Sequence, residues 1–210
     1  MRADNTLILF TKAPQICRVK TRMNAVLSHR ECLYLHRKLT ENAINQFQSN
    51  NKFKLVIYTT SIDKVRYSYP RGITVKKQIG KHLGAKMDNA INQETKNGQR
   101  TVLIGSDCLM LDINYIFKAF DNLSKSNNIV IGPTIDGGYV LIGMKKQNTF
   151  LFNNLPWGAS TVLDKTLVTA HKRGRKINTL EKISDLDTVE DLHQLKKLNI
   201  LPEWASILTN

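Results

Sequence analysis

The residues best suited to chemistry in this sequence follow three short apolar runs. Four cationic side chains come after the run "LILF": Lys12, Arg18, Lys20 and Arg22. Asp107 comes directly after "TVLIG", and Asp136 with the pair Gly137–Gly138 comes after "IVIG". Mg²⁺ is commonly held by one or two carboxylates together with substrate phosphates, while Lys and Arg neutralise the remaining phosphate charge. Residues of these types at one site would suit a metal-bridged phosphate ligand.

Each of these acidic residues also has a purely structural interpretation. Asp107 could cap a short turn instead of binding a metal, and Asp112 is better explained as the N-cap of the helix that follows it. The pair Asp136–Gly137 is a strong signal for a hairpin turn. Such a turn could still present Asp136 to a ligand, because the adjacent glycines let the backbone approach a ligand closely.

A second acidic segment, "ISDLDTVEDLHQL", holds four acids within seven positions. Helix capping explains part of it, with Thr188 as N-cap and with Glu190 and Asp191 complementing the helix dipole. Asp185 and Asp187 lie outside that helix, so one of them could reach a metal.

Glycines elsewhere give a weaker signal. The segment "KQIGKHLGAKM" places Gly80 and Gly84 ahead of a helix, where they could form an anion-binding helix start or simply a loop. The five histidines are scattered, and no Gly-x-Ser-x-Gly, Cys-His or zinc arrangement is present. Covalent nucleophilic catalysis is therefore not supported. A Gly-x-Gly-x-x-Gly after the first strand is also missing, which argues against a dinucleotide oxidoreductase.

The elements that must position these residues alternate between strands and helices. Short β-branched runs predict strands at Thr6–Thr11, Lys54–Thr60, Ile73–Lys77, Thr101–Ser106, Asn128–Gly132 and Tyr139–Met144. Capping patterns predict helices after Ser28, Asp112, Thr161 and Thr188. The alternation indicates an α/β protein with a mostly parallel sheet that is covered by helices. No linker, repeat or low-complexity tract divides residues 1–210, so we expect one domain.

The predicted sheet brings the candidate residues together. In open α/β sheets, ligands bind beyond the carboxyl ends of the strands. The cationic loop, Asp107 and the Asp136 turn each follow such an end. We therefore expect four cations, two carboxylates and a glycine pair at one edge of the sheet.

The net charge of +14, from 31 Lys and Arg against 17 Asp and Glu, has three explanations. A polyanion such as nucleic acid could be a partner, or the substrate could carry phosphates. Alternatively, many of the lysines simply lie on solvated helix faces, as in "LHRKLTEN" and "HQLKKLN". The aromatic content of 7% is low and no aromatic-basic interleaving is visible, which argues against nucleic acid without excluding it.

The remaining composition favours a cytoplasmic protein. No apolar run approaches the roughly 20 residues that a membrane-spanning helix needs, and the N-terminal region does not resemble a signal peptide. Cys17, Cys32 and Cys108 are odd in number and widely spaced, so we expect reduced thiols.

The ordered segments "FTKAP…RVKTRM", "LIGSDC", "GPTIDGGYVLIG", "LPWGAS" and "DLDTVEDL" together resemble a bacterial family of small transferases. The members are called selenodomain-associated transferases or uncharacterised glycosyltransferases. More distantly, the sequence is similar to 2-phospholactate guanylyltransferase and to CMP-sugar synthetases. The resemblance implies the glycosyltransferase-A, or nucleotide-diphospho-sugar transferase, fold: a three-layer Rossmann-like arrangement with a mixed, mostly parallel sheet and helices on both faces.

The resemblance also implies roles for particular residues. Asp107 and Asp187 would bind Mg²⁺ or Mn²⁺. The phosphates of a nucleotide would contact Lys12, Arg18, Lys20 and Arg22. If the helix start at Gly80 and Gly84 binds an anion, these two glycines would contact the phosphates as well. Lys20, Arg22 and Asp136 would take part in catalysis. The acceptor or sugar would face Asp136, Gly137 and Gly138. Trp157 matches a tryptophan of the family and could either face the acceptor or belong to the core or a lid.

The sequence thus predicts a metal-dependent transferase with a nucleotide or nucleotide-sugar donor and a small-molecule acceptor of unknown identity. Glycosyl transfer from an NDP-sugar and nucleotidyl transfer from an NTP to a phosphorylated acceptor both fit. The alternative is a basic nucleic-acid-binding or regulatory protein that has kept the fold and lost catalysis. Its support is the net charge, with Cys17 and Leu109 where the family has glycine and proline. The sequence gives no indication of oligomeric state.

Overall fold

One mixed sheet of seven strands forms the centre of the computed structural model, which describes residues 5–63, 70, 72–95, 99–124, 129–146 and 148–206. The order across the sheet is β3-β2-β1-β4-β6-β5-β7. The strands are β1 (Asn5–Thr11), β2 (Lys54–Thr59), β3 (Thr74–Lys77), β4 (Arg100–Gly105), β5 (Ile129–Pro133), β6 (Tyr139–Met144) and β7 (Ile177–Thr179). Strand β6 runs antiparallel to β4 and β5, whereas the other neighbouring strands pair in parallel. The predicted mixed, mostly parallel sheet is confirmed.

The β-branched runs locate six of these strands to within one residue at each described end; Asn128, the predicted start of β5, lies outside the described residues. The reversal at β6 follows from the short turn that joins it to β5, because only antiparallel neighbours can be joined by so few residues. Strand β7 was not predicted. Its three residues, "INT", are exposed or half-buried and give no apolar signal.

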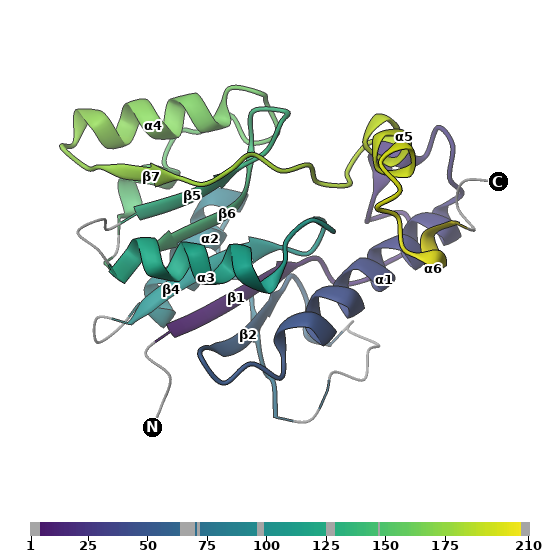
Figure 1. The fold of residues 1–210 in the computed structure, drawn as a ribbon, viewed down its shortest axis with the longest axis horizontal. Coiled ribbons are helices and arrows are strands. Elements are labelled where there is room, and N and C mark those ends of the chain that lie inside the picture. Colours follow the sequence, from purple (N-terminus) through teal and green to yellow (C-terminus); the bar gives the residue numbers. More distant parts are fainter. Residues whose placement is uncertain are drawn as a thin grey trace.

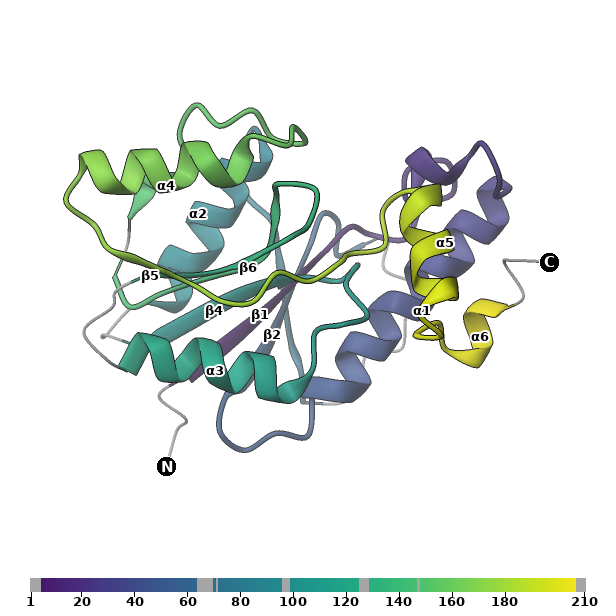
Figure 2. The same ribbon diagram turned by 45° about the horizontal axis from the view of Figure 1, so that its top comes forward.

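Helices cover both faces of the sheet, as Figures 1 and 2 show. The longer helices are α1 (His29–Phe47), α2 (Leu83–Glu94), α3 (Ile113–Ser124) and α4 (Val162–Lys172). Helix α3 and the C-terminal half of α1 pack on one face through a core that includes Phe47, Ile116 and Phe120. On the other face, α2, α4 and the short helix η3 (Thr149–Phe152) pack around Ile91 and Phe152. The three predicted layers are therefore confirmed.

A separate apolar cluster lies beside the sheet. It joins the short helix η1 (Thr21–Met23) and the N-terminal half of α1 to α5 (Val189–Lys197) and α6 (Glu203–Ser206). Met23, Leu35 and Leu192 are buried in it. In Figures 1 and 2, α5 and α6 flank α1 beyond the carboxyl ends of the parallel strands. Residues that follow those strand ends therefore lie between the sheet and this cluster.

Local capping sets where most of the helices begin. Ser28 with Glu31 and Thr188 with Asp191 form the predicted capping boxes at the starts of α1 and α5. The carboxylate of Asp112 accepts a hydrogen bond from the backbone N–H of Tyr115 at 2.7 Å, as expected of an N-cap for α3. Helix α4 also begins after Thr161 as predicted, but the Thr161 side chain makes no capping hydrogen bond.

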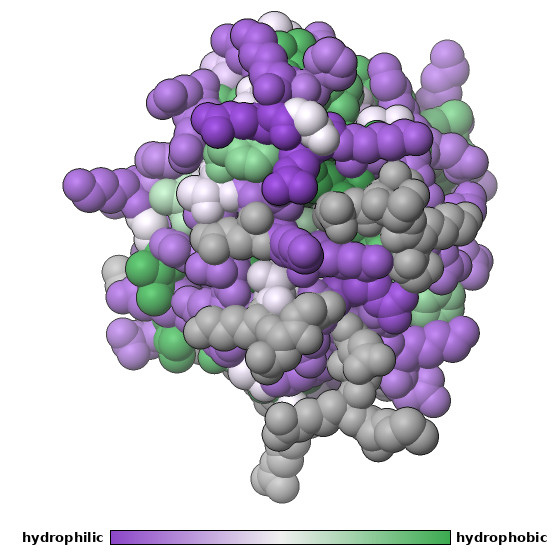
Figure 3. Space-filling view, turned by 90° about the vertical axis from the view of Figure 1, so that its left-hand side faces the viewer, coloured by the Kyte–Doolittle hydropathy of each residue, from purple (hydrophilic) through white to green (hydrophobic). Residues whose placement is uncertain are grey.

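Figure 3 shows the opposite end of the molecule, where the parallel strands begin. Hydrophilic side chains dominate among the described residues visible there, and the hydrophobic ones are scattered between them. The described helices include none that is both long enough and apolar enough to cross a membrane.

Candidate functional site

Two adjoining cavities, of about 410 and 470 Å³, lie at the carboxyl edge of the sheet. They share eight lining residues, which include Lys12, Lys20, Asp107 and Asp187. These four come from segments that follow β1, follow β4 and precede α5. Lys12, Lys20 and Asp107 follow strand ends, as the rule that ligands bind beyond strand ends predicts, whereas Asp187 precedes a helix and is not placed by that rule.

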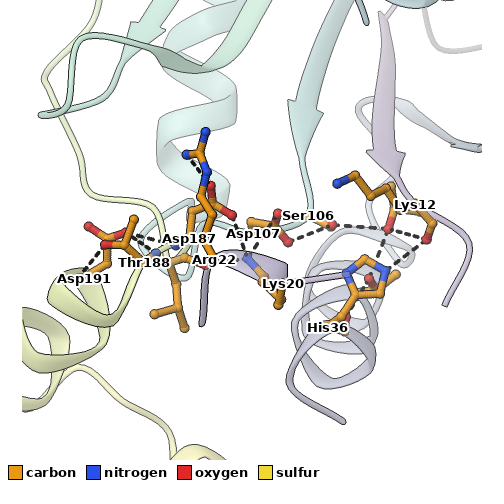
Figure 4. A network of polar contacts seen from close by, with 12 residues as sticks. Lys12, Lys20, Arg22, His36, Ser106, Asp107, Asp187, Thr188 and Asp191 are labelled. Atoms are coloured by element: carbon orange, nitrogen blue, oxygen red, sulfur yellow. Dashed lines mark hydrogen bonds and ion pairs between the residues drawn. The ribbon is translucent and has the colours of Figure 1, made fainter. Parts of the chain in front are cut away.

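Three charged side chains meet at the base of these cavities. The Lys20 ammonium lies 3.1 Å from Asp107 Oδ2 and 3.9 Å from Asp187 Oδ1, and it also donates a hydrogen bond to the backbone carbonyl of Leu186. The Lys20 side chain is 1% exposed, whereas Asp107 and Asp187 keep 39% and 36% of their side-chain surface. Figure 4 shows the ammonium between the two carboxylates.

Asp107 is held from several sides. Ser106 Oγ donates to Asp107 Oδ1 at 3.3 Å or to Thr11 Oγ1 of β1 at 3.2 Å, and the backbone N–H of Leu186 donates to the Asp107 carbonyl at 3.0 Å. Desolvation alone would raise the pKa of the Asp107 carboxyl. The Lys20 ammonium, followed by His36, outweighs it and brings that pKa below its ordinary value. Asp107 is therefore a fixed, ionised carboxylate at neutral pH.

The cap of helix α5 fixes Asp187, which directly precedes the N-cap residue. Asp191 Oδ2 accepts hydrogen bonds from the backbone N–H groups of Asp187 at 3.0 Å and Thr188 at 2.7 Å. Arg22 Nη1 lies 2.9 Å from Asp187 Oδ2. The Asp191 carboxylate therefore caps helix α5 and also fixes the backbone of Asp187.

This arrangement leads to a prediction for Asp191→Ala. Removing both hydrogen bonds should cost about 1–2 kcal/mol of stability, as for other lost caps, and should loosen Asp187. Thr188→Ala removes the capping hydroxyl while leaving both Asp191 bonds in place, and Glu190→Ala alters an exposed neighbour. We expect any loss of divalent-ion affinity, measured by Mn²⁺ titration in the presence of a nucleotide that stabilises the protein, to be larger for Asp191→Ala than for Thr188→Ala. Equal losses in these two variants would contradict the positioning role.

The remaining cations differ in how they meet the cavities. Arg22 is 56% exposed and lies over Gly158, where an added Cβ would come within 3.3 Å of its Nη2. Lys12 is exposed, and its backbone carbonyl lies 2.9 Å from His36 Nε2. A carbonyl can only accept, so Nε2 carries the proton. Burial lowers the pKa of His36 and outweighs the negative charge of Asp107, which acts to raise it. Burial therefore favours the neutral imidazole.

The segment after β5 forms the expected tight turn. Asp136 Oδ1 accepts hydrogen bonds from Thr134 Oγ1 and from the backbone N–H of Gly138, the latter at 3.2 Å. Gly137 adopts φ +89° and its carbonyl accepts from the Leu163 N–H at 3.0 Å. Asp136, Gly138 and Trp157 line one of the cavities. The turn therefore both closes the hairpin and faces the site.

Several predicted residues do not line the cavities. Arg18, Gly80, Gly84 and Gly137 are not among the residues that line either one. Gly84 is packed so closely that an added Cβ would meet the Phe152 carbonyl at 2.5 Å and the Trp157 ring at 2.9 Å. His82 caps α2 by accepting from the Ala85 N–H at 3.2 Å. The start of α2 is thus capped by a side chain of the protein, and the phosphate-binding roles of Gly80 and Gly84 stay predictions.

Asp185 is a site residue to which the sequence did not assign a specific role. It lines both cavities together with Asp187. Burial, followed by the charges of Asp136, Asp191 and Asp187, raises the pKa of its carboxyl to about 6. The cluster of four acids within seven positions was the only sequence feature that pointed to Asp185. It could not show that Asp136, from a different loop, acts on the same carboxyl.

The raised pKa of Asp185 makes stability depend on pH. Because the folded protein binds this proton more tightly than the unfolded chain, the group costs stability as pH rises from about 4 through 6. We expect Asp185→Asn to stabilise the protein by about 1–2 kcal/mol above pH 7, with the gain vanishing near pH 4. Urea unfolding with a chelator present, repeated across this range, measures the difference. A gain that is equal at all pH values would contradict the assignment.

The residues at the base of the cavities fit a divalent cation. Asp107 and Asp187 supply hard oxygen donors that already converge on one positive charge. Among the described residues, no group of three or more His, Cys, Asp or Glu side chains could hold a metal. A pair of carboxylates fits Mg²⁺, which usually takes its other ligands from water and phosphates.

Cys108 also lines one cavity, next to Asp107. Burial raises the pKa of its thiol to about 12, so the thiolate is scarce at neutral pH. A nucleophilic cysteine is therefore not supported, in agreement with the sequence.

Comparison with known proteins adds two findings at the level of family and sequence. The model of a family described as "Uncharacterized protein conserved in bacteria (DUF2064)" matches residues 43–159. Among curated proteins no match was found.

Solved structures match over almost the whole chain. A "putative nucleotide-diphospho-sugar transferase" from Desulfovibrio desulfuricans G20 is similar at 25% identity and TM-score 0.87, over 98% of this chain and 91% of that one. A CMP:2-keto-3-deoxy-manno-octonic acid synthetase complexed with CTP is similar at 7% identity and TM-score 0.58, over 93% and 98%. A 4-diphosphocytidyl-2C-methyl-D-erythritol synthase from Anaerococcus prevotii DSM 20548 is similar at 10% identity and TM-score 0.58, over 93% and 96%. The last two likenesses show a shared fold.

Proposed function

The chain belongs to the DUF2064 family of uncharacterised proteins conserved in bacteria. From the geometry of the site we propose that it is a metal-dependent transferase with a nucleotide-activated donor. One observation carries the proposal. Asp107 and Asp187 converge on a single cation at the base of a cavity that Lys12 and Arg22 also line. The similarity at 25% identity to a protein described as a "putative nucleotide-diphospho-sugar transferase" supports it.

The side chains divide into those that would hold a metal and those that would hold phosphate. Asp107 and Asp187 would bind Mg²⁺ or Mn²⁺, which would neutralise charge on the phosphates and on the leaving group. Lys12 and Arg22 would bind the phosphates from the open side of the cavity, with Arg22 oriented by its contact with Asp187. Charge stabilisation by preorganised cations requires no covalent intermediate.

The other side of the second cavity would receive the acceptor. Asp136 sits on a turn that its own hydrogen bonds make rigid, and Trp157 offers an apolar surface beside it. In this proposal, Asp136 orients the acceptor group that attacks the donor. Gly138 lets the backbone approach that group closely.

Two reactions fit this arrangement and differ in the group that leaves. In glycosyl transfer from an NDP-sugar, a nucleoside diphosphate leaves. In nucleotidyl transfer from an NTP to a phosphorylated acceptor, pyrophosphate leaves, and Lys20 and Arg22 are close enough to the cavity to stabilise its charge. Measuring pyrophosphate or nucleoside diphosphate release distinguishes the two reactions.

Ligand-induced thermal stabilisation tests the proposal. A panel of NTPs and NDP-sugars, each with Mg²⁺, with Mn²⁺ and with chelator, should contain at least one nucleotide that stabilises the protein only when metal is present. At a ligand concentration of 100 times Kd, the gain is about 2.7 kcal/mol, or roughly 5–10 °C in Tm for a chain of this size.

Two outcomes would contradict the proposal. If no nucleotide stabilises the protein, the donor assignment fails; salt-dependent binding to generic RNA or DNA would then favour the nucleic-acid alternative. If nucleotides stabilise equally with chelator, the metal assignment fails.

We also propose that the protein acts in the cytoplasm, because its three cysteines are unpaired.

A further inference from the structure

The backbone and side chain of Lys20 are both unusual. Its φ of 50° and ψ of 33° place it in the left-handed region, where non-glycine residues are uncommon. Its long side chain is nevertheless almost completely buried. Lysine is rarely buried without a partner, since burial of an ammonium is costly unless a charge and hydrogen bonds compensate it.

The compensation comes from the same carboxylates that would bind the metal. The ammonium lies 3.1 Å from Asp107 and 3.9 Å from Asp187. It also donates a hydrogen bond to the backbone carbonyl of Leu186, the residue before Asp187. Figure 4 shows Lys20 pointing toward Asp107, whereas Arg22 approaches Asp187 from another direction. Lys20 therefore occupies the position at which a divalent cation would meet both carboxylates.

We propose that in the nucleotide-free protein the Lys20 ammonium excludes a divalent cation from Asp107 and Asp187, and that the phosphates of a nucleotide draw the ammonium away and admit the metal. This inference rests on the proposed function. Two cations cannot share so small a space without strong repulsion. A lysine suits such an exchange, because its charge sits on a flexible four-carbon stem and can move between carboxylate and phosphate oxygens.

The arrangement has a consequence for the order of binding. Metal should bind weakly to the free protein and tightly once a nucleotide is present. Since binding free energies are linked, the nucleotide should in turn bind more tightly when metal is present. The negative charges of Asp107 and Asp187 would then always be neutralised, either by the Lys20 ammonium or by the metal.

Mn²⁺ binding without nucleotide, followed by electron paramagnetic resonance of the free ion, tests the exclusion. The variant Lys20→Met removes the ammonium and keeps a side chain of similar length. We expect it to bind Mn²⁺ on the order of tenfold or more tightly than wild type, because one unit of positive charge close to the ion is lost. The control Lys86→Met removes a lysine that lines the same cavity and forms no ion pair with either carboxylate, and its affinity should stay within about threefold.

The double variant Lys20→Met/Asp107→Asn should lose the gained Mn²⁺ affinity, which would show that the ion binds at this pair. Equal affinity in wild type and Lys20→Met would overturn the proposal, as would an equal gain in Lys86→Met. These measurements involve no nucleotide, so they decide the exclusion even if the proposed transferase activity fails.

A measurement on the unsubstituted protein covers the case in which Lys20→Met does not fold. Nuclear magnetic resonance of ¹⁵N-lysine-labelled protein detects ammonium groups that are buried and hydrogen-bonded. The Lys20 signal should keep its position when Mg²⁺ alone is added and should shift with Mg²⁺ plus any nucleotide that stabilises the protein. A shift with Mg²⁺ alone would overturn the exclusion, and an unchanged signal with a stabilising Mg²⁺–nucleotide would overturn the displacement.

Discussion

Asp107→Asn should abolish metal-dependent stabilisation by nucleotide and reduce transfer by about 10²–10³-fold, the loss typical of one preorganised charge-stabilising group. Asparagine keeps the size of the side chain but removes the charge that faces Lys20. The same change should lower stability by about 2 kcal/mol. That is less than the usual cost of breaking a buried pair, because Asp187 and the Leu186 carbonyl still face the ammonium.

Asp112→Asn is the matched control for this variant. Asp112 lies five positions further along the same segment and caps α3, a task that asparagine performs equally well. We expect its urea midpoint and its nucleotide-dependent thermal shift to equal those of wild type. If Asp107→Asn behaves like Asp112→Asn in the thermal shift with Mg²⁺ or Mn²⁺, Asp107 does not bind the metal.

Gly137→Ala should be the most destabilising single methyl addition in the turn between β5 and β6, at about 3 kcal/mol or more. The φ of +89° strains any residue with a Cβ, and that Cβ would lie 2.0 Å from the Ser160 carbonyl oxygen. Relief requires the turn to move away from the start of α4, so Asp136 and Trp157 should separate. Transfer should therefore fall even at temperatures where the variant remains folded.

Gly174→Ala separates backbone strain from steric clash. Gly174 also has a positive φ, +62°, but an added Cβ would meet no other heavy atom within 4 Å. Its cost should be about 1 kcal/mol. Urea unfolding of the two variants gives the contribution of the Ser160 contact by difference. A Gly137→Ala cost no larger than that of Gly174→Ala would show that the turn can relax freely.

The positions of the site residues followed from simple rules, whereas their contacts did not. Strand ends placed Asp107 and the Asp136 turn at one edge, and capping patterns placed Asp187 at the start of α5. These signals are local, so they can be read within a few neighbouring residues. The contact between Lys20 and Asp187 joins segments that are far apart in the chain, and it depends on a left-handed backbone at a residue that is not glycine. No local sequence pattern predicts a left-handed backbone at a lysine.

The same distinction explains the other unpredicted features. Strand β7 exists because β5 offers an open edge beside it, as the pairing of Ile129 with Ile177 shows. Gly84 follows a pattern that suggests an anion site, yet its lack of a side chain makes room for Trp157, which comes from a distant loop. In both cases the decisive neighbour is tertiary, so the sequence around the residue carries too little information.

The contacts that close the site span most of the chain, and this should determine when the site forms during folding. Lys20 and Leu186 are 166 positions apart, and Arg22 and Asp187 are 165 apart. Bringing such distant segments together costs loop-closure entropy that only an already organised sheet can offset. These contacts should therefore be absent from the folding transition state. Changes at Lys20 or Asp187 would then accelerate unfolding while leaving the refolding rate almost unchanged.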